Sequence, residues 1–483
     1  MNSRTTISIT LICFVGSLTI CAALAAQEQA PAPSPGYTVV WMGTLGGPQS
    51  NVPPFAHDIS GQDAVIGTAD TGDLDPNFPN SNFLIGQDPY IQHAAVSQHS
   101  VRTDLGALPG TNSSSALWVN ATGTVAGISE NGSIDPLIGI PEGRGVIWKN
   151  GQITDLGTLG GYESVAWAVN SSDQVAGCAA NAVPDDASLF GWGTQTRGFL
   201  YQNGGMQDLG TVGGPDACAT LLNDSGQVTG FSYNDSFAID VFLWTKGNMQ
   251  DLGGLGGTFG YPNYINNKGQ VVGASNLTGD QIQHAFLWDG VKMNDLGSLN
   301  QSFRRNDNSE AIAMNEAGHI VGHSTYSFNV EHAVLWKDGQ IIDLGTLPGD
   351  TCSVAWSINS KDQIVGFSGT GYCGVPRHAV LWQNGQIYDL SNMLSVQGSL
   401  TAAFYINDSG QIAAVGDVAL GGNGSRFYNT AQRAFLLIPS GGGSSHDGAA
   451  GSDRETLADR IGRPHNQLGA RYHVPGQPAA PRD

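Results

Sequence analysis

Charged side chains are scarce in this sequence. They make up 13% of 483 residues, with 20 Lys and Arg against 41 Asp and Glu. The net charge of −21 disfavours binding to nucleic acid or to an anionic bilayer, because phosphates would be repelled. Six cysteines occur, without CxxC or Cys/His zinc spacing. Beyond the N-terminal segment no apolar run approaches ~20 residues, so we expect no transmembrane span in the mature chain.

Glycine, by contrast, is abundant at 67 residues, about twice the usual share. Hydrophobic residues reach 40%, which is enough for a sizeable core and argues against wholesale disorder. Much glycine with few helix-forming charges favours short strands and tight turns. The composition therefore predicts an all-β chain.

The two ends differ from the rest of the chain. Residues 1–25 read as a signal peptide, with one charge at Arg4, an apolar stretch and small residues at Ala23 and Ala25. A lipid anchor at Cys21 and an uncleaved anchor helix are the alternatives. Residues 26–36 are predicted to be a linker and 439–483 a disordered Gly/Ser-rich tail. We expect a protein that is secreted, periplasmic or at the cell surface.

Between these ends one module repeats, and it is clearest at residues 251–288. It contains Asp-Leu-Gly, Leu-Gly-Gly, Asn-x-x-Gly-Gln-Val-Val-Gly and His-Ala-Phe-Leu-Trp, in this order. The third and fourth elements each occur eight times with drift. The Asp-Leu-Gly element recurs 43 to 53 residues apart, at Asp104, Asp155, Asp208, Asp251, Asp295, Asp343 and, as Asp-Leu-Ser, Asp389.

The sequence pattern of each module predicts four short strands, which we name a to d. Examples are 355–359 for strand a, 270–273 for strand b and 285–288 for strand c, while strand d ends in Asp-Leu-Gly. Asn-Gly or Asp-Gly between c and d favours a type I′ hairpin, as at 150–151. Four-stranded units in series predict a single β-propeller over residues 37–438, with eight blades; seven is the alternative.

The order of strands at the two ends predicts how the ring closes. Residues 37–47 align with 152–161, which is a strand d and the loop after it. The repeat region ends with a strand c at 433–437 and no strand d. We therefore expect the N-terminal strand to complete the C-terminal blade, which removes open sheet edges.

These motifs resemble the probable extracellular repeat family called HAF, after its His-Ala-Phe motif. That motif stands here at 284–286, with variants at 332–334 and 378–380. The resemblance covers residues 37–438 and implies export and repetition. It implies no activity, substrate or catalytic residue.

The recurring polar and aromatic residues favour structural roles. The recurring His is replaced by Arg144, Arg197 and Arg433 in three modules, so we expect a donor to a neighbouring loop carbonyl and not a catalytic or metal-binding residue. The recurring Asp is expected to accept backbone N–H groups in the d–a turn. The recurring Trp and Phe are expected to fill gaps between blades, with a sugar-binding platform as the alternative.

The loops differ more from module to module than the strands do. In a propeller the b–c and d–a loops share one face, and here the b–c loops vary most, at 68–92, 178–196, 128–143 and 417–432. Variable loops on a rigid scaffold are where binding sites are built. Within the longest loop, Asp70, Asp73, Asp75 and Asn77 are candidate calcium ligands, although the run lacks an EF-hand pattern.

Two disulfides are predicted on the same face. Cys13 and Cys21 belong to the N-terminal segment, which leaves four cysteines. Cys352 lies in a d–a loop and Cys373 in the b–c loop of the same module, and Cys178 and Cys218 occupy a b–c loop and the next d–a loop. We expect Cys352–Cys373 and Cys178–Cys218 bridges.

Three functions fit the sequence. The first is an exported, monomeric, non-catalytic scaffold that binds a protein or glycan through the loop face. The second is an extracellular polysaccharide hydrolase or lyase, which rests on fold analogy alone. The third is a structural component of the cell surface. No Gly-x-Ser-x-Gly, His-Glu-x-x-His or phosphate-cradling motif is present.

Overall fold

The structure is a computed structural model that describes residues 35–440, apart from 54–56, 58, 61–63, 99–100, 111, 300–306, 329, 372, 374–375 and 420–429. The predicted signal peptide, most of the linker and most of the tail therefore lie outside the described residues. No helix in the described part is long and apolar enough to cross a membrane. The regular secondary structure of the described chain is β-strand apart from one short 3-10 helix, as the composition predicted.

The strands form antiparallel sheets of four in chain order. The first sheet contains β2 (Gly46–Asn51), β3 (Val65–Leu74), β4 (Tyr90–Gln98) and β5 (Val101–Asp104). The second contains β6 (Ser114–Val119), β7 (Val125–Ile134), β8 (Pro141–Lys149) and β9 (Gln152–Asp155). The third contains β10 (Gly160–Val169), β11 (Val175–Pro184), β12 (Thr194–Gln202) and β13 (Gly205–Asp208).

The next sheet has eight strands in two antiparallel halves. One half contains β14 (Gly213–Leu222), β15 (Val228–Asn234), β16 (Ile239–Thr245) and β17 (Asn248–Gly253). The other contains β18 (Gly256–Ile265), β19 (Val271–Leu277), β20 (Gln283–Trp288) and β21 (Met293–Asp295). One parallel pair, Ile239 with Phe259, joins the halves.

Three further sheets of four strands complete the described chain. One contains β22 (Ser309–Met314), β23 (Ile320–Ser327), β24 (Val330–Lys337) and β25 (Gln340–Asp343). The next contains β26 (Cys352–Ile358), β27 (Ile364–Gly369), β28 (His378–Gln383) and β29 (Gln386–Asp389), and the 3-10 helix η1 (Ser391–Met393) follows. The last contains β30 (Gly398–Ile406), β31 (Ile412–Ala419), β32 (Thr430–Pro439) and β1 (Tyr37–Trp41).

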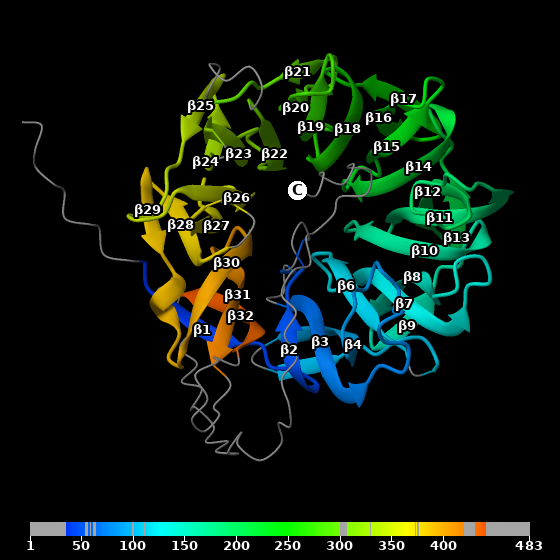
Figure 1. Ribbon diagram of the computed structural model, residues 1–483, viewed down its shortest axis with the longest axis horizontal. Coiled ribbons are helices and arrows are strands. Elements are labelled where there is room, and N and C mark those ends of the chain that lie inside the picture. Colours follow the sequence, from blue (N-terminus) through cyan, green and yellow to red (C-terminus); the bar gives the residue numbers. More distant parts are fainter. Residues whose placement is uncertain are drawn as a thin grey trace, which may run out of the picture. The chain divides into compact units, whose positions relative to one another are not determined.

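The N-terminal strand pairs with the C-terminal one, as predicted. β1 runs antiparallel to β32, with Val39 opposite Leu437 and Val40 opposite Leu436. Along the chain each four-stranded unit contacts the next, and the last unit contacts the first through β32 and β2 (Figure 1). The first strands of neighbouring units, such as β6 and β10, also contact one another.

Turn and strand geometry follow from the repeated residues. Asn150 and Gly151 have φ of 52° and 73°, and the turns at 203–204, 338–339 and 384–385 match them, so the type I′ prediction is confirmed at these hairpins. The Gly that ends Gly-Gln-Val-x-Gly faces a bulge in the first strand. A Cβ on Gly366 would overlap the carbonyl oxygen of Val354. This close approach requires glycine.

The Asn that opens the same motif shapes the turn between the first two strands. The Oδ1 of Asn170 accepts hydrogen bonds from the backbone N–H groups of Ser172 and Gln174, both at 3.0 Å. Asn223 repeats this pattern in the next unit. The side chain thus satisfies backbone donors that the tight turn leaves unpaired.

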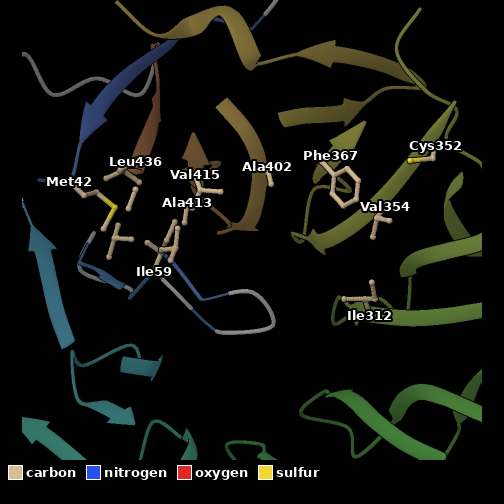
Figure 2. Close-up of a cluster of buried hydrophobic side chains, with 13 residues drawn as sticks. Met42, Ile59, Ile312, Cys352, Val354, Phe367, Ala402, Ala413, Val415 and Leu436 are labelled. Atoms are coloured by element: carbon tan, nitrogen blue, oxygen red, sulfur yellow. The ribbon is translucent and has the colours of Figure 1, made fainter. Parts of the chain in front are cut away.

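Apolar side chains fill the space between adjacent sheets, as predicted for Trp and Phe. In one cluster Ala313 and Leu335 of one sheet pack with Ile364 and Trp382 of the next. A cluster beside the β1–β32 pair brings residues of several sheets together (Figure 2). Its members include Met42, Ile59, Ile312, Cys352, Val354, Phe367, Ala402, Ala413, Val415 and Leu436.

Candidate functional site

In three modules the recurring His pairs with the recurring Asp, whereas His378 contacts Asp350 at 2.9 Å instead. His284 Nδ1 lies 2.8 Å from Asp295 Oδ1, and His93 and His332 contact their Asp residues at 2.9 and 3.0 Å. The expected partner was a loop carbonyl, which His284 reaches additionally, at Asp307 O, through Nε2. The expectation was therefore wrong for the main contact, because strand register places the Asp beside the imidazole.

The paired Asp also changes the pKa of the His. Burial disfavours the charged imidazole of His284, but the hydrogen bond to Asp295 and the charges of Asp295 and Asp307 outweigh it and raise its pKa. Asp295 also accepts from the Gly297 N–H at 2.8 Å, which confirms the predicted role of the Asp in the turn. These repeated residues therefore hold the hairpins in place.

The long loops between the second and third strands of the first three sheets are packed against one another. Leu84 of one loop, Ile138 of the next and Leu189 of the third contact a single cluster that contains the buried Trp192. Asn82, fully buried, donates from Nδ2 to Pro141 O at 3.0 Å and to Glu163 Oε2 at 3.1 Å. The variable loops thus form an interlocked layer in this part of the molecule.

The four candidate calcium ligands do not come together as one ligand set. Both oxygens of Asp70 are engaged, by the Gln49 N–H and the Gln92 side chain. Asp75 accepts from the Asn77 N–H and the Ser81 hydroxyl, and Asp73 is exposed. Within the described ranges, no group of three or more His, Cys, Asp or Glu side chains is placed to hold a metal ion.

Asp70, Glu163 and Asp216 are among the buried carboxylates of the first four sheets. Burial raises the pKa of Asp70 to about 7, of Glu163 to about 8 and of Asp216 to about 6. Each carboxylate accepts a backbone N–H from a neighbouring strand or loop, as Asp216 does from Thr196 at 2.7 Å. Buried acids thus tie the loops to the sheets.

Both predicted disulfides are present. Cys178 pairs with Cys218 and Cys352 with Cys373, with Cα–Cα distances of 5.0 and 5.7 Å. Cys178, Cys218 and Cys352 lie within strands β11, β14 and β26 and not in loops. The Cys178–Cys218 bridge therefore links adjacent sheets directly.

A pocket of about 330 Å³ lies between the sheets of β19–β20 and of β22–β24. It opens where the loops between second and third strands lie, on the face predicted to bind. Polar side chains line it: Asn276, Asp280, Gln281, Gln283, Asn308, Ser309, Glu310, His323, Ser324 and Glu331.

The pocket centres on an imidazole between two carboxylates. His323 Nε2 lies 3.4 Å from Glu310 Oε2, and His323 Nδ1 lies 3.4 Å from Glu331 Oε2. Glu310 also accepts from Asn263 Nδ2 at 2.9 Å. The pKa of the buried Tyr261 lies well above its usual range. Burial is the larger cause, and the charge of Glu310 is the second. The two carboxylates approach opposite ring nitrogens, so the imidazole bridges them.

Motif analysis did not find these residues, but their departure from the repeat is visible in the sequence. The position of Glu310, opposite the strand-b glycine, holds an uncharged residue in other units: Asn51, Ser115, Val165, Cys218, Tyr261 or Val354. His323 follows that glycine at a position that holds Phe367 in the next unit. A carboxylate at a repeat position where the other units carry an uncharged residue is the signal.

No family model and no curated protein matches the chain. Among solved structures it is similar to an acylaminoacyl peptidase of Pyrococcus horikoshii, at 10% identity over 77% of this chain and 58% of that one, with a TM-score of 0.43. It is also similar to the β-propeller domain of the Trilobed protease of Pyrococcus furiosus, at 10% identity over 72% and 97%, with a TM-score of 0.38. The SapL1 lectin in complex with alpha methyl fucoside matches at 13% identity over 57% and 95%, with a TM-score of 0.29. The chain thus spans less than two thirds of the peptidase.

Proposed function

We propose that residues 37–438 form an eight-bladed β-propeller that acts as an exported, non-catalytic binding scaffold. Eight four-stranded units in chain order, contacts between neighbouring first strands, and β1 as the fourth strand of the last unit support the blade count. Two disulfides in the described chain support an oxidising compartment and therefore export.

The polar pocket is the binding site in this proposal, and a glycan is the ligand class that it fits. Side-chain amides such as those of Asn276 and Asn308 can both donate to and accept from sugar hydroxyls. Carboxylates such as Glu331 accept from hydroxyls, while Lys and Arg are absent from the lining. An anionic ligand would be repelled by three acids, whereas a neutral polyhydroxylated one would not.

A glycan array followed by calorimetry tests this proposal. Wild type should bind a neutral glycan, and Glu310→Gln and Asn308→Ala should each weaken binding at least tenfold. Asp338→Asn is the matched control, because it changes one carboxylate in a hairpin turn away from the pocket and keeps a residue that tolerates its φ of 53°. Binding that persists in both pocket variants would place the ligand elsewhere.

Catalysis on a polysaccharide is the second candidate, and the two carboxylates beside His323 favour it. Incubating the bound glycan with wild type and assaying for new reducing or unsaturated ends separates the two functions. Turnover that is lost in Glu310→Gln and Glu331→Gln would make the pocket an active site. An unchanged glycan supports the scaffold role.

A further inference from the structure

The pocket beside His323 holds more negative charge than its own side chains balance. Asp280, Glu310 and Glu331 line it, and no Lys or Arg of the described residues does. His323 is the single basic side chain in this lining, and it lies 3.4 Å from a carboxylate oxygen on either side. The side chain of Glu331 is 37% exposed, so a group from solvent can contact it. The pocket therefore attracts a cationic group.

The pocket also has the size and the acceptors that a guanidinium group needs. Its volume of about 330 Å³ is roughly ten times the share of one water molecule in the liquid. A guanidinium group presents five N–H donors in one plane, which match carboxylates and side-chain carbonyls. The Oε2 atom of Glu310 is held by His323 at 3.4 Å, which is long for a hydrogen bond. The amide of Asn276 adds a carbonyl oxygen to the lining.

The chain itself carries a segment of the opposite charge. Residues 460–482, which we call the basic segment, contain Arg460, Arg463, Arg471 and Arg482 and no Asp or Glu. In the whole chain, by contrast, acidic residues outnumber Lys and Arg by 41 to 20. The basic segment belongs to the predicted tail and lies outside the described residues. Its charge is complementary to that of the pocket.

The basic segment is long enough to reach the pocket. It follows Ser440, whose N–H donates to the Gly36 carbonyl oxygen at 2.8 Å and marks the end of the last sheet. Arg460 and Arg471 lie 20 and 31 positions further along the chain. At about 3.3 Å per residue these lengths allow spans of up to about 66 and 100 Å. A compact domain of about 400 residues has a radius of gyration of about 21 Å, so either face is within reach.

We propose that the basic segment docks in this pocket of the same chain, with an arginine side chain between Glu310 and Glu331, and that it competes there with the glycan. The competition rests on the proposed function, whereas the docking does not. A flexible tether gives the segment an effective concentration of about 1 mM at the pocket. With a Kd of about 0.1 mM, the segment leaves the pocket free about one-tenth of the time and weakens glycan binding about tenfold.

A peptide titration tests the docking without any glycan. The receptor is the full chain with Arg460→Gln, Arg463→Gln and Arg471→Gln, which frees its own pocket, and the probe is the basic segment as a synthetic peptide. Calorimetry should give a Kd of about 0.1 mM at 0.05 M NaCl, and binding should weaken at least threefold at 0.5 M NaCl. Adding Glu331→Gln to the receptor should weaken the peptide at least fivefold. Asp338→Asn, in a hairpin turn away from the pocket, should leave it unchanged.

Glycan affinity tests the competition in the intact chain. The triple arginine variant should bind the glycan about tenfold more tightly than wild type. Lys246→Gln, Lys292→Gln and Lys361→Gln together are the matched control, because they remove the same charge from exposed positions between strands. This control should change glycan affinity less than twofold.

Two results of the titration overturn the docking. The first is a peptide that does not bind at 1 mM, and the second is a peptide whose affinity is the same with and without Glu331→Gln. Should Glu331→Gln fail to fold, Glu310→Gln takes its place. If the peptide binds but neither protein binds a glycan, the docking stands and the proposed function fails.

Two further results would assign the pocket to another occupant and contradict the proposal. In the first, light scattering shows that wild type dimerises with concentration while the triple arginine variant stays monomeric, so the segment of a second copy docks. In the second, Arg304→Gln with Arg305→Gln strengthens glycan binding and the triple arginine variant does not. A monomeric wild type with tighter glycan binding in the arginine variant alone supports docking within one chain.

Discussion

The side-chain Nδ2 of Asn223 donates to the backbone carbonyl oxygen of Asn266 at 3.0 Å, from one four-stranded unit to the next. The same bond links Asn120 to Asn170, Asn170 to Asn223, Asn315 to Asn359, and Asn359 to Asn407. The Asn of the repeated motif therefore serves two purposes. It closes its own turn through Oδ1 and fastens the neighbouring unit through Nδ2.

Replacing Asn223 by Ala should lower the free energy of unfolding by about 2–4 kcal/mol, because two turn N–H groups lose their acceptor and the Asn266 carbonyl keeps only the Gly269 N–H as a donor. Urea denaturation measures this loss. Asn248→Ala, at an exposed position in a hairpin, should change stability by less than about 0.5 kcal/mol. Equal effects in the two variants would mean that the inter-unit bond contributes nothing.

Replacing Gly366 by Ala should destabilise the protein by at least about 3 kcal/mol or prevent folding, because the new Cβ meets the Val354 carbonyl oxygen. Gly205→Ala is the matched control, since its nearest atom would be 3.9 Å away and its φ is not positive. Tm and soluble yield measure both variants. A Gly366→Ala protein as stable as the control would show that the bulge can relax.

Removing the inter-sheet disulfide with Cys178→Ala and Cys218→Ala together should lower stability by about 4 kcal/mol, because the bridge closes a long loop between two residues with a sequence separation of 40. The Tm of wild type should fall on reduction with dithiothreitol, and that of the double variant should fall less. If reduction lowers both equally, the remaining Cys352–Cys373 bridge carries the effect.

Stability should fall as pH rises from about 4 to above 7, and Asp70 should account for part of this fall. Burial, with help from the charge of Asp88, raises the pKa of Asp70 from 3.8 to about 7. The folded protein holds this proton more tightly than the unfolded chain, so the stabilisation is complete below the unfolded value and is lost as pH passes the folded one. The loss is at most about 4 kcal/mol.

Asp70→Asn should remove this contribution. The difference in unfolding free energy between wild type and variant, measured from pH 4 to pH 8, should shift in favour of the variant as pH rises. Asp73→Asn provides the baseline for an exposed carboxylate in the same strand, β3. Parallel stability curves for wild type and Asp70→Asn would contradict the expectation.

Features of the fold that depend on repetition could be predicted from the sequence. The hairpin at Asn150 and Gly151, the pairing of β1 with β32 and both disulfides follow from residue types and their order. The His–Asp contact was not predicted, although the two residues of each pair have a sequence separation of 11, because a constant interval does not say which side chains the strand register brings together.

The site depends on residues that have no counterpart in the other modules, so the repeat does not predict them. Asn82 reaches two neighbouring sheets from a loop whose path no periodic pattern specifies. The pocket combines Glu310 and His323 with residues of another unit, and that arrangement arises when sheets pack. The signal in the sequence is a carboxylate, Glu310, where the other modules carry an uncharged residue.

The pairing of β1 with β32 also sets the order in which the molecule can be completed. Val39 is synthesised about 400 residues before its partner Leu437. During most of translation β1 therefore has no β32 to pair with. The last sheet can form only after residue 439 has left the ribosome. Completion of the last sheet is therefore a late event, and a chaperone that covers β1 until then would protect the immature protein from mispairing.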